Sequence, residues 1–403
     1  MHVIPSVAPR YGGPSSAVSA MCRSLNDSGV ETLIATTNGD GPGHLTIATG
    51  APLKFNGADT IFFHRQFSDR FGYSYPLARW LNLNVTNFDV VHIHAVFSHA
   101  CIASALACRR NGVPYIVRPL GSLDPWSINQ KPWRKRLMWQ VAVGRMLRDA
   151  AAVHYTTLEE KRQAESINRL ARGVVIPLGI TVNDSAIDDA GKLFKSRYPS
   201  LGDHPYILVL SRLHTKKNLE ALIEAFLNVS NDEDFAGWRL VIAGDGEKSY
   251  TERLKSLAGN TDGGDRVVFT GWLADDLKTS ALVDAQLLAL PSFQENFGLC
   301  VAEALGFGVP VIVSRAVNLA PDVLAAEAGW VTGLGAGELE RTLTAAMSDE
   351  EERKRRGRAG REFVARRFAW SQVAAELIQF YQSVIRNEVE QVATTQTVQL
   401  AGQ

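Results

Sequence analysis

The chain has 403 residues, 46% of them hydrophobic, and its formal net charge is zero. This length and apolar content allow two full hydrophobic cores, so we expect two domains. No uncharged apolar stretch approaches the roughly 20 residues that a bilayer-spanning helix needs, and no nucleic-acid partner is expected.

The charge is divided unevenly along the chain. Residues 1–182 contain 19 Lys and Arg against 11 Asp and Glu, and residues 183–403 contain 23 against 31, which gives +8 and −8. A basic half can lie at an anionic surface, such as lipid headgroups or a pyrophosphate-bearing acceptor.

The opening residues, MHVIPSVAP, include no charged leader segment and no cleavage site. They predict a cytoplasmic protein, with a peripheral position at the inner face of the membrane as a further option. The first strand begins so close to Met1 that we expect the natural start to lie upstream. No two cysteines have the short spacing of a zinc or redox pair, which favours buried thiols in a reducing compartment; they are Cys22, Cys101, Cys108 and Cys300.

In the first half, short β-rich runs alternate with helical stretches at 15–28, 98–111 and 158–171, which predicts a series of βαβ units and a largely parallel sheet. The predicted strands are HVIPSV (2–7), ETLIATT (31–37), FDVVHIHAV (88–96), PYIVRP (114–119), AAVHYTT (151–157) and GVVIPLG (173–179).

The polar segment 183–204 is rich in turn-forming residues, and the alternation restarts after it. We therefore predict an amino-terminal, acceptor-side domain over 1–182, a linker over 183–204 and a donor-binding domain over 205–369. A helix over 370–386 should pack back on the first domain, and 387–403 should be a disordered tail. The second set of strands is YILVLSR (206–212), WRLVIAG (238–244), RVVFTG (266–271), AQLLALPS (285–292) and VPVIVS (309–314).

Residues 291–314, PSFQENFGLCVAEALGFGVPVIVS, carry two carboxylates near the start of one predicted helix. Glu295 lies in the loop before the helix, and Glu303 lies within it. The free N–H groups at a helix start form an anion site suited to a diphosphate, and a carboxylate further on can accept both hydroxyls of a ribose. The N–H groups in question belong to Asn296, Phe297, Gly298 and Leu299.

Residues 206–226, YILVLSRLHTKKNLEALIEAF, place Arg212 after a strand and Lys217 at the opening of an amphipathic helix. The guanidinium offers a planar fork to two phosphate oxygens, and the ammonium adds a mobile point charge. The pair can neutralise the charge that builds on a departing diphosphate without a metal.

These segments, with LVIAGDGE (240–247) and VVFTGWL (267–273), resemble the donor-domain motifs of glycosyltransferase family four, group one. The resemblance extends over nearly the whole chain, since YGGP (11–14) is similar to the family's glycine loop. It implies an α/β protein of the GT-B fold, in which two Rossmann-like, doubly wound parallel-sheet domains face each other across a cleft. It also implies retaining transfer from a nucleoside-diphosphate sugar, with no other cofactor and no metal.

Carried over to this chain, the resemblance implies that Arg212 and Lys217 bind the donor diphosphate. Glu303 would then bind the ribose, and Glu295 would bind the transferred sugar.

The same resemblance implies that Gly12 and Gly13 line the donor phosphates and that His94 reaches the sugar. His92 and His94 share one face of a strand, which also permits a metal site together with His99 or a purely structural role.

Two positions depart from the family pattern: Leu120 stands where many relatives have His, and Leu178 stands where Asn is common. The first departure directs attention to Arg118, Ser122 and Asp124 as acceptor-side candidates. A turn stabilised by Asp124 before Pro125 is the alternative.

Residues 131–150, KPWRKRLMWQVAVGRMLRDA, interleave basic and apolar side chains. Such a helix can lie on an anionic membrane, or it can pack its apolar side inward and leave a solvated basic face. With the basic first half, it favours a glycan or lipid-linked acceptor, as in bacterial-type polysaccharide or lipid-linked glycan synthesis.

The rival functions are a GT-B epimerase, a phosphorylase and a noncatalytic module that binds nucleotide sugars. A dinucleotide-dependent oxidoreductase is disfavoured because no G-x-G-x-x-G follows the first strand.

Overall fold

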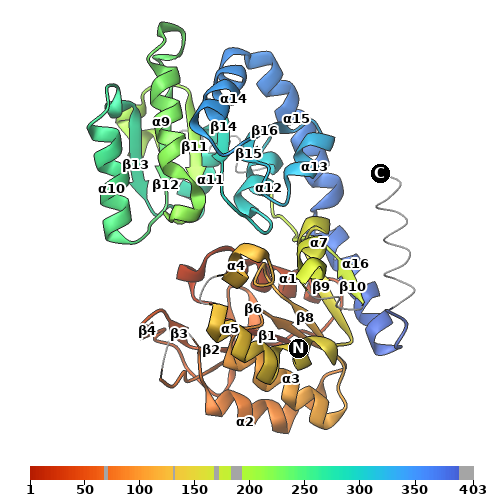
Figure 1. Cartoon of the computed structure of the whole chain (residues 1–403). Helices are drawn as coiled ribbons and strands as arrows, with labels where there is room; N and C mark the ends of the chain where they lie inside the picture. Colours follow the sequence, from red (N-terminus) through yellow and green to blue (C-terminus); the bar gives the residue numbers. More distant parts are fainter. Residues whose placement is uncertain (68–70, 130–131, 168–171, 183–192, 390–403) are drawn as a thin grey trace. The chain divides into compact units, whose positions relative to one another are not determined.

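The computed structural model describes residues 1–67, 71–129, 132–167, 172–182 and 193–389 (Figure 1). The chain forms two compact units. The first consists of Met1–Gly179 together with the segment that starts at Trp370, and the second consists of Ile180–Ala369.

The first unit contains an eight-stranded sheet in the order β10-β9-β8-β7-β1-β2-β6-β5. Every neighbouring pair is parallel except β5 and β6, which form an antiparallel hairpin. A small antiparallel pair, β3 (Gly39–Asp40) and β4 (Gly43–His44), lies outside this sheet. The strands are β1 (His2–Ser6), β2 (Ile34–Thr37), β5 (Pro52–Phe55), β6 (Ala58–Phe63), β7 (Val91–His94), β8 (Tyr115–Arg118), β9 (Ala152–Tyr155) and β10 (Gly173–Val175).

Helices flank this sheet. One of them follows the second unit in sequence but belongs to the first unit. Helix α16 (Trp370–Ile385) packs against α1 (Gly13–Asp27), and the Ser24 hydroxyl donates a hydrogen bond to the Trp370 carbonyl at 3.0 Å. The other helices are α2 (Tyr75–Asn84), α3 (His99–Asn111), α4 (Pro125–Asn129), α5 (Pro132–Met138), the π-helical η3 (Trp139–Val143), α6 (Gly144–Arg148) and α7 (Leu158–Ile167), with short 3-10 turns η1 (Pro9–Tyr11) and η2 (Val85–Asn87).

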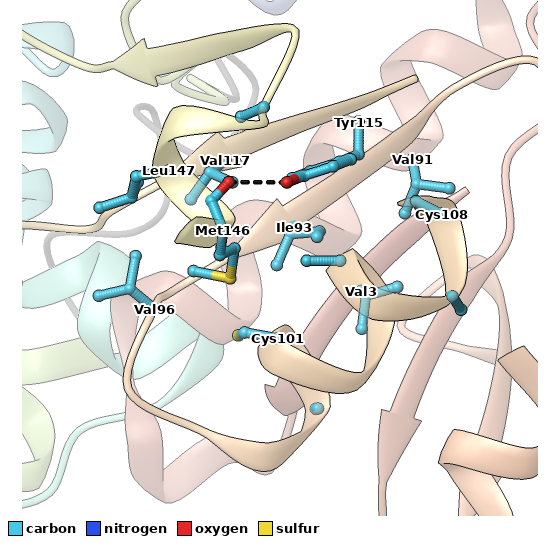
Figure 2. Packing of buried hydrophobic residues seen from close by; sticks show 14 of the residues in the cluster. Val3, Val91, Ile93, Val96, Cys101, Cys108, Tyr115, Val117, Met146 and Leu147 are labelled. Atoms are coloured by element: carbon cyan, nitrogen blue, oxygen red, sulfur yellow. Dashed lines mark hydrogen bonds between the residues drawn. The ribbon is translucent and has the colours of Figure 1, made fainter. Parts of the chain in front are cut away.

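The core of the first unit lies between the central strands and helices α3 and α6, as Figure 2 shows. In the hydrogen bond that Figure 2 draws, the Tyr115 hydroxyl donates to the Met146 carbonyl at 2.7 Å. Burial raises the pKa of Tyr115, so the hydroxyl keeps the proton that it donates. This bond connects β8 to α6 within the apolar cluster.

The second unit contains a six-stranded, all-parallel sheet in the order β13-β12-β11-β14-β15-β16. This is the doubly wound order in which the direction of winding reverses between the first and fourth strands, here β11 and β14. The strands are β11 (Tyr206–Leu210), β12 (Arg239–Ala243), β13 (Val267–Gly271), β14 (Leu287–Leu290), β15 (Val311–Ser314) and β16 (Gly329–Thr332). The helices are α9 (Leu219–Ser230), α10 (Lys248–Gly259), α11 (Asp275–Asp284), α12 (Leu299–Gly306), α13 (Ala320–Ala325), α14 (Ala336–Ser348) and α15 (Glu350–Arg367), with 3-10 turns η5 (Pro199–Leu201), η6 (Thr215–Lys217), η7 (Glu233–Phe235) and η8 (Gly264–Arg266).

The two units meet in sequence at Gly179 and Ile180, a few residues before the segment 183–204 that we expected to be a linker. Residues 183–192 lie outside the described part of the chain. From 193 onward this segment belongs to the second unit, where Phe194 and Leu201 are fully buried and the Phe194 ring packs on Tyr198 and Tyr206.

The predicted alternation of strands and helices, and the parallel sheets, are confirmed. Most of the predicted tail over 387–403, namely 390–403, lies outside the described residues; residues 387–389 are described, and Val389 is buried. Among the described residues, no helix combines the length and apolar character required to cross a bilayer.

Candidate functional site

The charged residues singled out in the second half lie after β11 and β14, at the point where the strand order reverses. Arg212 is exposed in the loop after β11, and Lys217 closes the 3-10 turn before α9. Asn218 adopts a left-handed conformation (φ 56°), and its buried side chain donates a hydrogen bond to the Leu334 carbonyl at 3.0 Å. This fixes the direction in which the chain leaves the loop and enters α9.

Three cationic residues, Arg212, Lys216 and Lys217, lie in the segment between β11 and α9. The pKa of His214 is lowered by partial burial and by the nearby charges of Arg212, Lys216 and Lys217, and Glu247 only partly opposes them. Burial contributes most to this lowering of the pKa, and the cations that add to it would favour a bound anion in this loop.

Glu295 follows β14 in a loop that backbone hydrogen bonds hold in place. Its N–H donates to the Ala316 carbonyl at 3.1 Å, and its carbonyl accepts from the Asn318 N–H at 2.9 Å. Its carboxylate forms an ion pair with the Lys217 ammonium, and the two side chains are 22% and 14% exposed. Burial by itself raises the pKa of Glu295, but Lys217 and the neighbouring cations outweigh burial and hold the pKa below its usual value.

The helix that begins after Glu295 opens at a glycine. Gly298 caps α12 with φ 79°, and a Cβ there would approach the Val301 side chain to 3.3 Å. The Phe297 ring is buried against Phe368, so of this residue only the backbone is available to a ligand. The first N–H groups of α12 have no partner within the helix, which makes this end a site for negative charge.

Glu303 lies one turn into α12 and pairs with a residue that the sequence did not indicate. Its carboxylate accepts a hydrogen bond from the Lys278 ammonium on α11 at 2.7 Å, with both side chains partly exposed. Two lysine–carboxylate pairs therefore lie at the two ends of the same short stretch, Glu295–Glu303. Lys278 could not have been found from spacing, because it is contributed by a different helix.

In the first unit, Gly12 joins η1 to α1 with φ 69°, and a Cβ there would meet no atom within 4 Å. The backbone conformation, rather than crowding, therefore favours glycine at this position. Gly13 is the first residue of α1. The roles in phosphate binding that the resemblance gives to Gly12 and Gly13 stay predictions.

His92 belongs to a buried hydrogen-bonded chain with a defined direction. The Ile176 carbonyl can only accept, so His154 Nε2 donates to it at 2.8 Å. Neutral His154 then accepts at Nδ1 from His92 Nε2 at 3.2 Å, and His92 Nδ1 accepts from the Tyr381 hydroxyl at 2.8 Å. Burial lowers the pKa of both histidines, so neutral rings satisfy the whole chain.

His94 belongs to a second buried chain and has no exposed surface. The Arg118 guanidinium lies 3.5 Å from His94 Nδ1 and can only donate, so His94 Nε2 donates to His2 Nδ1 at 3.0 Å. This burial differs from the sugar-facing position that the resemblance implies for His94, and that contact stays a prediction.

The histidines that lie close enough to share a metal ion differ from the set that the sequence suggested. Nitrogen atoms of His2, His92 and His94 lie within 4.8 Å of one another, whereas His99 lies apart and accepts a hydrogen bond from the Ser74 N–H at 3.2 Å. The hydrogen bonds above account for the close approach of the rings, and the buried Arg118 charge opposes a cation beside them.

Two of the three acceptor-side candidates have partners within the protein. Arg118 is 1% exposed, and Asp124 is 4% exposed. The Asp124 carboxylate accepts from the N–H and hydroxyl of Ser127 at 2.6 and 2.7 Å, which corresponds to the alternative of a turn fixed by Asp124. Ser122 is partly exposed, unlike the other two candidates.

Comparison with known proteins identifies the family. A model of the glycosyl transferase 4-like domain matches residues 12–179, and a model of the group 1 glycosyl transferases matches residues 193–363. The chain belongs to glycosyltransferase family four, group one.

Relatives and solved structures are similar over much of the chain. A phosphatidyl-myo-inositol mannosyltransferase of Mycobacterium leprae is 28% identical over 74% of each chain. A GDP-mannose-dependent phosphatidylinositol monomannoside mannosyltransferase of Mycobacterium tuberculosis is 29% identical over 51% of this chain and 54% of its own length, so the chain spans about half of that relative. The crystal structure of Anabaena HepE with UDP and glucose has a TM-score of 0.75 at 18% identity, covering 95% of this chain and 98% of the other, and shows that the fold is GT-B.

Proposed function

We propose that the protein is a metal-independent, retaining glycosyltransferase that moves a sugar from a nucleoside-diphosphate sugar to an acceptor hydroxyl. The observation that carries the proposal is a pair of lysine–carboxylate contacts, Lys217–Glu295 and Lys278–Glu303. Both lie near the start of α12, where the order of the strands reverses. Names of relatives that include GDP-mannose and phosphatidylinositol, and a neighbour crystallised with UDP and glucose, support donors and lipid-linked acceptors of this kind.

The donor diphosphate would lie between the loop after β11 and the first turn of α12. Arg212 and Lys217 supply positive charge, and the N–H groups at the helix start supply fixed dipoles. When a donor binds, Lys217 can exchange its contact with Glu295 for one with the diphosphate. The charge that develops on the leaving group is then stabilised without a divalent ion.

The two carboxylates would bind different parts of the donor. Glu303 is positioned one turn inside α12, where a carboxylate can accept both ribose hydroxyls, and Glu295 lies in the loop before the helix, within reach of the transferred sugar. Front-side attack by the acceptor requires no side-chain nucleophile, and the resemblance to the family supports retention.

The test is release of nucleoside diphosphate from GDP-mannose, UDP-glucose and UDP-N-acetylglucosamine, with and without vesicles that contain phosphatidylinositol. We expect one donor to give acceptor-dependent release in EDTA and an α-linked product by NMR. Loss of activity in EDTA that magnesium or manganese restores would contradict metal independence. Acceptor-independent isomerisation of the sugar would favour an epimerase, phosphate-dependent cleavage a phosphorylase, and donor binding without turnover a binding module.

We further propose that residues 132–148 attach the protein to an anionic membrane surface. Trp133, Leu137 and Val141 recur every fourth residue and are 67%, 56% and 73% exposed, so they form an apolar stripe on the solvent side. Exposed arginines flank the stripe, and Val143, Met146 and Leu147 pack into the core below it. An exposed apolar stripe with basic neighbours is suited to the interface of an anionic bilayer. The flanking arginines are Arg134, Arg136, Arg145 and Arg148.

Sedimentation with vesicles of phosphatidylglycerol and phosphatidylcholine tests this attachment. Leu137→Ser should weaken binding about threefold to tenfold through loss of apolar burial, whereas Leu106→Ser, at an exposed leucine of α3, should not. Binding should also fall as salt increases. Equal binding to neutral and anionic vesicles would refute the electrostatic part of the proposal.

A further inference from the structure

The loop that follows β8 in the first unit has an unusual backbone. Leu120 and Gly121 adopt consecutive left-handed conformations with φ 56° and 68°, and a hydrogen bond from the Ser122 N–H to the Pro119 carbonyl closes a turn around them. A left-handed leucine costs roughly 1 kcal/mol or more, and such strain persists only where surrounding groups impose it.

A buried carboxylate from another element holds this loop. Glu160 lies in the first turn of α7 and is 4% exposed. One of its oxygens accepts a hydrogen bond from the Gly121 N–H at 2.9 Å, and the other accepts from the N–H and hydroxyl of Thr156 at 2.7 and 2.8 Å. A single side chain thus joins the loop after β8 to the loop after β9.

The local sequence alone would assign Glu160 a different role. The Thr157 hydroxyl accepts from the Glu160 N–H at 3.0 Å, which is half of a capping box at the start of α7. In a complete capping box the glutamate would turn back to the N–H of Thr157 itself. Here the carboxylate is directed instead to Thr156 and Gly121, so its contacts extend beyond its own helix.

The same carboxylate balances a buried charge. Arg118, the last residue of β8, is 1% exposed, and burial lowers its pKa to about 10, while the Glu160 charge opposes that lowering. A buried carboxylate is costly unless hydrogen bonds and a nearby opposite charge compensate it. Glu160 accepts three hydrogen bonds, one from Gly121 after β8 and two from Thr156 after β9, and the charge of Arg118 acts on it from the end of β8.

We infer that Glu160 is a positioning residue for transfer: it fixes the Pro119–Asp124 loop in the strained conformation that presents Ser122 to the acceptor. The inference rests on the proposed function, because Ser122 is a candidate acceptor contact. Glu160 does not touch the substrate in this role. It acts by setting the conformation of Leu120 and Gly121.

The test is the variant Glu160→Gln, with Glu159→Gln, a partly exposed neighbour in the same turn of α7, as the matched control. The amide nitrogen of glutamine would face an N–H donor, so at least one of the three hydrogen bonds is lost. With GDP-mannose and phosphatidylinositol vesicles, the apparent KM for phosphatidylinositol should rise about tenfold in Glu160→Gln. The KM for GDP-mannose and hydrolysis without acceptor should change by less than about twofold, and hydrogen exchange should accelerate in residues 119–124.

Unchanged KM for phosphatidylinositol, or an equal rise for donor and acceptor, would overturn the inference. If Glu160→Gln does not fold, Thr156→Val removes one hydrogen bond and keeps the carboxylate, and it should raise the acceptor KM about threefold; no change would again overturn the inference. If wild-type protein hydrolyses and transfers nothing, the proposed function fails for these substrates. In that case, hydrogen exchange alone tests whether Glu160 fixes the loop. Unchanged exchange in residues 119–124 of Glu160→Gln would overturn the positioning role.

Discussion

Charged and polar residues gather at the carboxyl ends of parallel strands in both units, but the two groups differ in exposure. In the second unit, the side chains of Lys217, Glu295 and Glu303 are 14% to 24% exposed. In the first unit, His94 and Arg118 are 0% and 1% exposed. Similar topology therefore places ionisable groups at a surface in one unit and in the interior of the other.

This difference in exposure distinguishes residues that can bind a ligand from residues that maintain the structure. A partly exposed ion pair can exchange its partner for a phosphate or a hydroxyl at little cost. A buried neutral histidine that is hydrogen-bonded at both nitrogens, such as His92, cannot be approached without breaking those bonds. Charge at a strand end is thus a useful indication of a binding site only when exposure is known.

The largest expected effect is at Lys217. Lys217→Met should lower the rate of nucleoside diphosphate release about a hundred- to a thousandfold, because the leaving diphosphate loses a cation and Glu295 loses its counter-charge. Lys255→Met, at an exposed lysine of α10 that pairs with Glu252 of the same helix, is the control and should retain full activity. Activity in Lys217→Met within about threefold of wild type would remove Lys217 from the site.

The buried histidines should instead control acid stability. Their folded pKa values are lowered, so below pH 6.5 the unfolded chain binds more protons than the folded one. Stability is therefore complete above about pH 6.5 and decreases as the pH falls toward the folded values, which is about 3 for His154. At pH 5, His154 alone should remove about 2 kcal/mol.

Urea unfolding between pH 4 and 7 measures this effect. His154→Gln keeps an acceptor and a donor but does not titrate, so the slope of unfolding free energy with pH should decrease by about one proton. An unchanged slope would mean that His154 is already accessible to protons in the folded protein.

A smaller effect is expected at the start of the histidine chain. Tyr381→Phe leaves His92 Nδ1 without its donor and should destabilise the first unit by about 1–2 kcal/mol. Tyr75→Phe, at an exposed tyrosine, should cost less than about 0.5 kcal/mol. Titration of both variants with GDP and UDP should give wild-type affinities. Weaker nucleotide binding by Tyr381→Phe would show that the buried histidine chain of the first unit also supports nucleotide binding.

Most of the fold could be predicted from sequence because buried parallel strands are continuous apolar runs separated by helices. The hairpin β5–β6 was missed although Asn56 and Gly57, with φ 48° and 76°, form a turn whose sequence is a strong hairpin signal. Its first strand, β5 (PLKF), alternates between exposed and half-buried residues and does not resemble the buried strands around it, whereas the second strand, β6 (ADTIFF), is mostly buried.

The candidate site was less predictable because spacing does not report exposure or contacts between helices. Glu295 and Glu303 could be found from their position around a helix start, whereas Lys278 could not. His92 and His94 were grouped correctly by strand alternation, but their partners His2, His154 and Tyr381 come from other elements. In sequence, Glu160 is an ordinary first-turn glutamate, and its contact with the Gly121 N–H arises only from the fold.

The most direct test of the account is calorimetric titration of Glu303→Gln and Glu295→Gln with UDP and GDP. Ribose is common to donor and product, so Glu303→Gln should weaken binding of the nucleotide that the wild type prefers about ten- to a hundredfold. Glu295→Gln should leave that affinity within about threefold, because its proposed partner, the sugar, is absent. Equal weakening by both variants, or wild-type affinity in both, would contradict the division of the donor between the two carboxylates.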